Sequence, residues 1–148
     1  MNKMTALSLS EMAANAASAA ALMKMLGNEH RLLILCHLIA EEELSVGDLT
    51  SRIELGQSAL SQHLAKLREQ GLVAFRRKAQ SLFYRVSDER AAAVLVLLHE
   101  MFCPSEGESS HLRRGWMAVR KKVRKETVHE SPDRFDPAQQ FFRSSRVC

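Results

Sequence analysis

The sequence is poor in cysteine, proline and aromatic residues, and the shortage of cysteine excludes two classes of small protein. Its 148 residues include three cysteines and three prolines, and aromatic residues make up 5%. Cysteines at positions 36, 103 and 148 are too few for a disulfide scaffold and have no zinc-finger spacing. The apolar residues, 46% of the chain, are mostly Leu, Ala, Val and Met, which favours helices around an ordinary hydrophobic core.

Long apolar runs are also missing. The longest run, AAAVLVLL at residues 91–98, is far shorter than the roughly 20 residues that a membrane-spanning helix needs. The N-terminal stretch MNKMTALSLSEMAANAASAA is interrupted by Ser, Glu and Asn, so it lacks the continuous apolar segment of a secretory signal. We therefore expect a cytoplasmic protein that does not bind membranes and whose thiols are normally reduced.

The net charge of +4 is unevenly distributed. Residues 1–104 hold 11 basic and 11 acidic residues, whereas the rest of the chain holds 10 and 6. The composition changes at Pro104, where the linker-like PSEGESS precedes a basic segment with Trp116. We expect one domain over residues 1–104 and a basic, loosely ordered extension over residues 105–148. In this extension residues 112–125 could form a short helix, and Trp116 could dock on the core.

Apolar spacing and capping residues predict the order of the elements. The helix predicted over about residues 89–103 is apolar on nearly all sides, so we expect it to be buried against a second subunit. Ser45 and Asp48 have the spacing of a capping box, and Gly71 is placed to end a helix. Helices are predicted over about 10–25, 29–39, 46–53, 58–70 and 89–103, with strands over 72–78 and 82–86.

Two helices joined by a tight turn and followed by a two-stranded ribbon form the order of a winged helix-turn-helix. The predicted fold class is thus mainly α with a small β-hairpin wing. Such a fold places the second helix of the motif in the major groove of DNA. Each polar residue alone is typical of any solvated surface, and the joint order favours DNA binding. The candidate groove-reading residues are Gln57, Ser58, Ser61, Gln62 and His63, and the candidate wing contacts are Arg76, Arg77, Lys78, Gln80, Ser81 and Tyr84.

The segments LGNEHRLLILCHL and SALSQHLAKLREQGLV resemble the ArsR family of repressors. The resemblance spans roughly residues 9–104 and leaves the extension unexplained. It implies a homodimer built on the first and last helices of the domain. The dimer would bind an inverted repeat in double-stranded operator DNA, with its two recognition helices about 34 Å apart.

Many repressors of this family sense metals, but the metal motifs are absent here. The family's cysteine pair in ELCVCDL is replaced by Ser45 and Gly47 in ELSVGDL, so thiolate ligation is unavailable there. The last helix offers a single histidine, His99, which cannot make the usual site between helices. We expect no bound metal.

Cys36 in RLLILC and Cys103 in FCP can be read as small buried hydrophobes. Their positions are similar to those in the BigR/SqrR/YgaV branch of the family. That resemblance implies that Cys36 and Cys103 sense a persulfide or oxidant as inducer, and that bridging them releases the DNA. Cys148 has no counterpart in that branch, and no sensing role is expected for it.

Two alternatives to this reading stay open. One is a metal-responsive repressor that uses Cys36, Cys103 and a nearby histidine. The other is a winged helix that binds proteins and whose cysteines are inert. No enzyme and no cofactor are expected, because there is no Cys-x-x-Cys motif and no acid–base set around either thiol.

Overall fold

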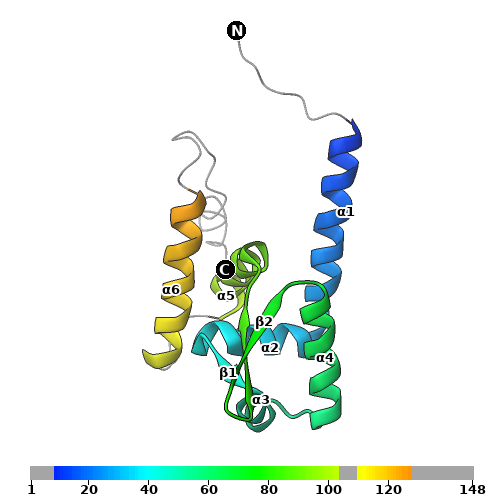
Figure 1. Ribbon diagram of the computed structural model, residues 1–148. Coiled ribbons are helices and arrows are strands. Elements are labelled where there is room, and N and C mark those ends of the chain that lie inside the picture. The colour runs from blue at the N-terminus through cyan, green and yellow to red at the C-terminus, as the bar shows by residue number, and fades with distance from the viewer. Residues whose placement is uncertain (1–8, 104–109, 128–148) are drawn as a thin grey trace, which may run out of the picture.

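Helices and short strands follow one another in the order of a winged helix-turn-helix (Figure 1). The computed structural model describes residues 9–103 and 110–127. The predicted fold class is confirmed. The elements are α1 (Leu9–Leu26), α2 (Glu29–Glu41), β1 (Leu44–Ser45), α3 (Val46–Arg52), α4 (Gln57–Glu69), β2 (Val73–Lys78), β3 (Ser81–Val86), α5 (Glu89–Phe102) and α6 (Ser110–Thr127). None of the helices in these two segments is long and apolar enough to cross a membrane.

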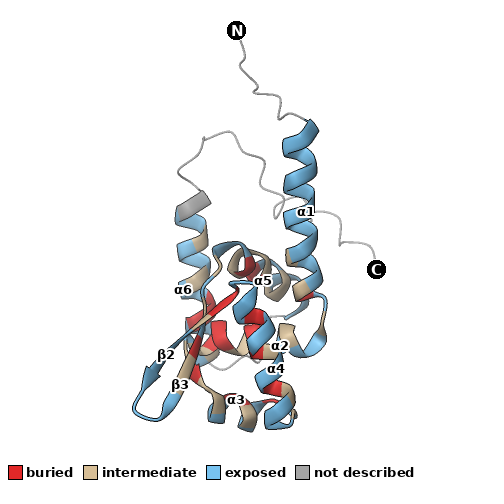
Figure 2. Cartoon of the chain, turned by 45° about the vertical axis from the view of Figure 1, so that its right-hand side comes forward, coloured by how far each residue is buried: buried red, intermediate tan, exposed pale blue. Residues whose placement is uncertain are grey.

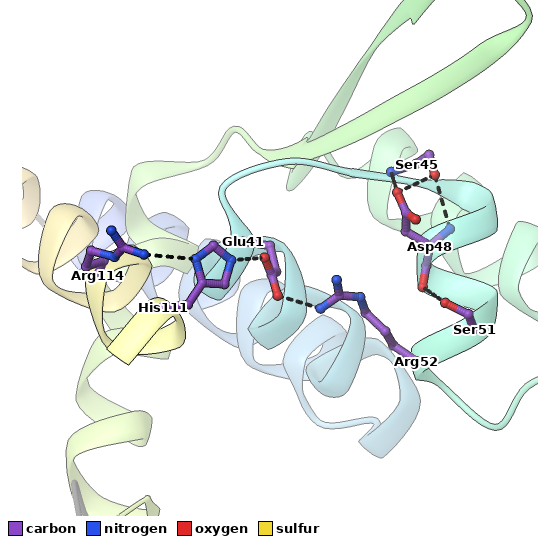
Figure 3. Close-up of polar contacts among 7 residues, drawn as sticks. All are labelled: Glu41, Ser45, Asp48, Ser51, Arg52, His111 and Arg114. Atoms are coloured by element: carbon purple, nitrogen blue, oxygen red, sulfur yellow. Dashed lines mark hydrogen bonds and ion pairs between the residues drawn. The ribbon is translucent and has the colours of Figure 1, made fainter. Parts of the chain in front are cut away.

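Local signals set the ends of the two helices of the helix-turn-helix. α3 begins with a capping box, in which Ser45 Oγ accepts the Asp48 N–H at 3.1 Å and the Asp48 carboxylate accepts the Ser45 N–H (Figure 3). α4 turns a stripe of buried leucines inward, and the chain leaves it through Gly71. The φ angle of Gly71 is 72°, a left-handed conformation that glycine adopts without strain. Both features agree with the sequence prediction.

The sheet has three strands rather than the expected two. β2 and β3 form the predicted antiparallel hairpin, with Phe75 opposite Tyr84. The two-residue strand β1 pairs with the other edge of β3, so the strand order is β1-β3-β2. A strand this short has no alternating pattern, which is why the sequence did not reveal it. Its pairing makes β3 the central strand.

The core is built around α2, which crosses the middle of the molecule (Figure 1). Its side chains pack with the inward leucines of α4 and with Leu95 of α5. This packing fixes the recognition helix relative to α2 and α5. The fully buried large residues are Ile34, Leu35, Leu38, Ile39, Leu49, Leu60, Leu64, Leu67 and Leu95.

α1 extends away from the body of the molecule and is exposed along most of its length (Figure 2). Apolar side chains on α1 and on the end of α5 are exposed, including Met12, Met23, Met101 and Phe102. Within this one chain α5 buries only Ala91, Leu95 and Val96. The homodimer on α1 and α5 stays a prediction, and these exposed side chains are the surface that it would cover.

The division into residues 1–104 and 105–148 also stays a prediction, but one part of the extension differs from the expected loose order. Residues 110–127 form a packed helix, α6, which is longer than the short helix considered near residues 112–125. α6 lies against α2 and α5, and its Trp116 is only 7% exposed. Leu112, Trp116, Val119 and Val123 recur at helical spacing along α6, and this pattern is the signal that could have predicted a packed helix.

A glycine allows α6 to approach α2 very closely. A Cβ atom at Gly115 would lie 2.0 Å from the carbonyl oxygen of Ala40 and 2.7 Å from that of Ile39. Only a residue without a Cβ fits such a contact between backbones. Ion pairs surround it, with Arg120 2.8 Å from Glu100 of α5. α6 is therefore seated by steric fit as well as by charge.

Candidate functional site

The predicted groove-reading residues lie together on the outer face of α4. Gln57, Ser58, Ser61 and Gln62 are all exposed. They lie at the N-terminal end of the helix and opposite its leucine stripe. The first turn of α4 contains no acidic residue, so no carboxylate there would repel a phosphate. The surface has the polarity that reading of base edges requires.

His63 differs from its neighbours because it is half-buried. Its ring lies 5.7 Å from that of His30 on α2. Burial lowers the pKa of His63, and the nearby His30 and Arg31 lower it further. The side chain is therefore neutral near pH 7 and lies at the edge of the reading face rather than at its centre.

The wing presents its basic residues at the hairpin tip. Arg77, Lys78 and Gln80 are exposed there, and in both views the tip lies at the same end of the molecule as α3 and α4 (Figures 1 and 2). Arg76 is held differently: its Nη2 is 2.6 Å from Glu43, and its guanidinium lies over the Phe83 ring. Glu43 offsets the charge of Arg76, so Arg77 and Lys78 are the stronger candidates for phosphate contact.

Tyr84 is buried, unlike the other predicted wing contacts. The residue is only 7% exposed, and its ring packs 5.6 Å from Phe75. β3 is the central strand, so the middle of this strand is covered by both neighbours and by the core. Tyr84 thus packs within the wing, and its contact with DNA stays a prediction.

Cys36 and Cys103 line one cavity of about 420 Å³ between α2, α5 and α6. Cys36 lies on the middle of α2 and is half-buried, whereas Cys103 caps the C-terminus of α5 and is exposed. The Cys103 N–H donates to the His99 carbonyl at 2.9 Å, which holds the residue against the end of the helix. Other lining residues include Leu32, Leu33, Leu98, Phe102, Leu112 and Trp116.

The two thiols differ in exposure, and the Cys36 thiol ionises less readily than an ordinary cysteine. Burial, and to a smaller extent negative charge on Cys103, raises the pKa of Cys36 to about 11. Because the thiolate is the nucleophile, Cys36 is a poor attacking group at neutral pH. The exposed Cys103 is the better first nucleophile.

This difference predicts the order of alkylation. In a Cys148→Ala chain at pH 7.5, iodoacetamide is expected to modify Cys103 before Cys36, because the raised pKa keeps Cys36 protonated. The Cys36 rate should rise about tenfold per pH unit up to its pKa. Peptide mass mapping over time gives both rates. In urea the difference should vanish, and faster labelling of Cys36 in the folded chain would contradict the assignment.

A histidine and the tryptophan of α6 form part of the cavity wall. The rings of His99 and Trp116 are stacked, with centroids 4.0 Å apart and planes 17° from parallel. The stack links the last turn of α5 to α6. Sequence reasoning placed His99 near Cys103 but did not show that Trp116 lies beside it.

A polar bridge joins α6 to the helix-turn-helix (Figure 3). The Glu41 carboxylate, at the end of α2, accepts from His111 of α6 through one oxygen and from Arg52 of α3 through the other. The His111 and Arg52 hydrogen bonds lower the pKa of Glu41. Sequence reasoning missed this bridge, because its residues are far apart in the chain and form no motif.

No group of three or more histidine, cysteine, aspartate or glutamate residues that could hold a metal ion occurs within residues 9–103 and 110–127.

Known proteins with the same architecture share much of this sequence. The family model described as "Bacterial regulatory protein, arsR family" matches residues 28–74, which hold α2, α3 and α4. The transcriptional activator HlyU of Vibrio cholerae is 53% identical over 97 residues, covering 66% of this chain and 89% of the relative.

Solved structures agree with the sequence matches. The structure described as reduced HlyU from Vibrio cholerae aligns with a TM-score of 0.62 over 65% of this chain and 100% of its own. The transcriptional repressor BigR from Xylella fastidiosa aligns at 40% identity with a TM-score of 0.59, over 65% of this chain and 97% of its own. The resemblance read from the sequence is confirmed, and the chain belongs to the ArsR family of bacterial transcriptional regulators.

Proposed function

We propose that the chain is a homodimeric repressor that binds operator DNA while Cys36 and Cys103 are reduced and releases it when they are bridged. The observation that supports this most strongly is that the two thiols line one cavity, although they lie on different helices. One of the related structures is described as reduced HlyU, so HlyU has a distinct reduced form. A redox state is thus a property that one related protein has.

The DNA-binding half of the proposal rests on α4 and the wing. The exposed face of α4 would enter the major groove, and Arg77 and Lys78 at the wing tip would contact phosphates. In a two-fold dimer two such surfaces face an inverted repeat. Winged helices that bind proteins need no such basic tip beside a polar helix face, so DNA is the favoured partner.

The sensing half follows ordinary thiol chemistry. The Cys103 thiolate attacks the outer sulfur of a persulfide RSSH, forming Cys103–S–SH and expelling RS⁻. The Cys36 thiolate then attacks Cys103 Sγ and expels HS⁻. The sum converts two thiols and RSSH into a disulfide, RSH and H₂S, so the two cysteines are oxidised and the sulfane sulfur is reduced.

A covalent link across the cavity would act through α2 on the position of the recognition helix α4. The helix shares a core with the leucines of α4, and its last residue, Glu41, holds Arg52 of α3. Pulling α2 toward the end of α5 strains both contacts. A dimer whose two recognition helices shift no longer fits both half-sites. A coupling of about 1–3 kcal/mol corresponds to a 5- to 150-fold change in affinity.

The test measures DNA affinity and mass on the same samples. Operator fragments are first selected from a random DNA library with the reduced protein. Treatment with a persulfide should remove two hydrogens per chain by intact mass and weaken binding 5- to 150-fold, with recovery after reduction. Peroxide and a disulfide are tested in parallel.

Single variants separate the switch from side effects. Cys36→Ala and Cys103→Ala should bind the operator and no longer respond, whereas Cys148→Ala should respond as the parent does. If bridged protein binds as tightly as reduced protein, the sensing half of the proposal is wrong. If no DNA is selected at all, the DNA-binding half is wrong.

A further inference from the structure

Helix α6 forms one wall of the cavity that Cys36 and Cys103 line. This helix lies in the extension over residues 105–148, which the family resemblance leaves unexplained. Leu112 and Trp116 reach the cavity from α6 and face the leucines of α2 and α5. The seating of α6 is specific, because Gly115 fits against the Ala40 carbonyl and Trp116 stacks on His99. Specific packing contacts therefore hold this wall of the cavity in place.

The lining of the cavity is apolar and carries no permanent charge. None of its described lining residues is aspartate, glutamate, lysine or arginine. Leucines, Phe102 and Trp116 dominate it, and the polar groups are the two thiols, His37 and His99. The volume of about 420 Å³ lies within the usual range of small-molecule sites, about 300–1,000 Å³. Burial lowers the pKa of His37, so this side chain is neutral as well.

We propose that α6 makes this cavity a binding site for uncharged organic sulfane-sulfur compounds with hydrocarbon substituents, and that it presents their sulfur chain to Cys103. The inference rests on the thiol switch proposed above and names its inducer class. Each methylene buried in the cavity should improve binding about fourfold. A glutathione-derived donor would instead have to bring carboxylates into an apolar lining, which is unfavourable.

The reaction with a dialkyl trisulfide RSSSR needs no further reagent. The Cys103 thiolate attacks an outer sulfur, forms Cys103–S–S–R and expels RSS⁻. The Cys36 thiolate then attacks Cys103 Sγ and expels RS⁻. The products are the Cys36–Cys103 disulfide, RSSH and RSH, so two thiols are oxidised while the trisulfide is reduced. The hydrocarbon group R stays near the α6 wall until it leaves.

The test compares two trisulfides of opposite polarity. Full-length Cys148→Ala protein is treated with diallyl trisulfide or with glutathione trisulfide, and disulfide formation is followed by intact mass. Each rate is divided by the rate of the same reagent with free N-acetylcysteine, which removes intrinsic reactivity. The normalised preference for diallyl trisulfide should be at least about tenfold.

Two variants locate the preference in the cavity. Leu33 lines the cavity and is 41% exposed, so Leu33→Lys introduces a cation without emptying the core. It should reduce the preference for diallyl trisulfide and favour the anionic reagent. Met117→Lys places the same charge on an exposed part of α6 outside the lining and should leave the preference unchanged.

The outcomes separate this inference from the proposed function. If both reagents form the bridge at the ratio seen with free thiol, the selective cavity is disproved and the thiol switch stands. If neither reagent forms the bridge, the thiol switch itself is disproved, and the inducer class with it. A preference that Met117→Lys reduces as much as Leu33→Lys would also overturn the assignment to the cavity.

Discussion

Glutamate in place of Ser61 is expected to lower operator affinity by more than about a hundredfold. Ser61 is exposed on the outer face of α4, among the residues proposed to face the major groove. A carboxylate there would meet the negative potential of DNA, and juxtaposed like charges cost several kcal/mol in an interface. About 2.7 kcal/mol already corresponds to a hundredfold loss. Fluorescence anisotropy with the selected operator at fixed salt measures the change.

The control keeps the charge change and moves it away from the reading face. Ser110→Glu adds the same carboxylate at the exposed first residue of α6. It should change affinity only slightly, because surface charges far from the interface are screened at physiological salt. Circular dichroism checks that both variants are folded. Equal losses for the two variants would show that α4 does not carry the DNA contact.

Alanine in place of Gly115 should destabilise the chain, although helix propensity alone predicts the opposite. In an exposed helix Gly→Ala stabilises by about 1 kcal/mol. Here the added Cβ would overlap the Ala40 carbonyl oxygen at 2.0 Å, and backbone on both sides leaves little room to yield. Overpacking typically costs about 1–3 kcal/mol. We expect a net loss in the free energy of unfolding or the release of α6 from the core.

The fluorescence of the single tryptophan reports the second outcome directly. Trp116 is the only tryptophan in the chain and is buried between α6 and α5. Release of α6 should shift its emission to longer wavelengths and expose it to quenchers. Gly56→Ala is the matched control, because a Cβ at Gly56 has open space around it. An unchanged emission and a higher stability for Gly115→Ala would contradict the close packing.

Much of the fold follows from short-range patterns. The capping box at Ser45, the left-handed turn at Gly71 and the hairpin of β2 and β3 depend on residues close together in the chain. The leucine stripe of α4 depends only on helical spacing. Local interactions of this kind are readable from a sequence, because the partners are separated by a fixed small number of residues.

The candidate site was readable only in part. Residues of α4 lie on the exposed face because their neighbours at helical spacing are apolar. The burial of Tyr84 could not be predicted, since it depends on pairing with β1, which leaves no local pattern in the sequence. Trp116 was recognised as a residue that could dock, but its stack on His99 depends on how the helices pack.

The sequence by itself determined the order of the elements, the polar face of α4, the basic wing tip and the family. Each of these depends on spacing along the chain. Only the tertiary structure decided that Cys36 and Cys103 share a cavity, that α6 supplies its wall and that Glu41 joins α6 to α3. These contacts bring together residues that are distant in the chain. Their geometry is fixed by packing of the whole core, as the fit of Gly115 against Ala40 illustrates.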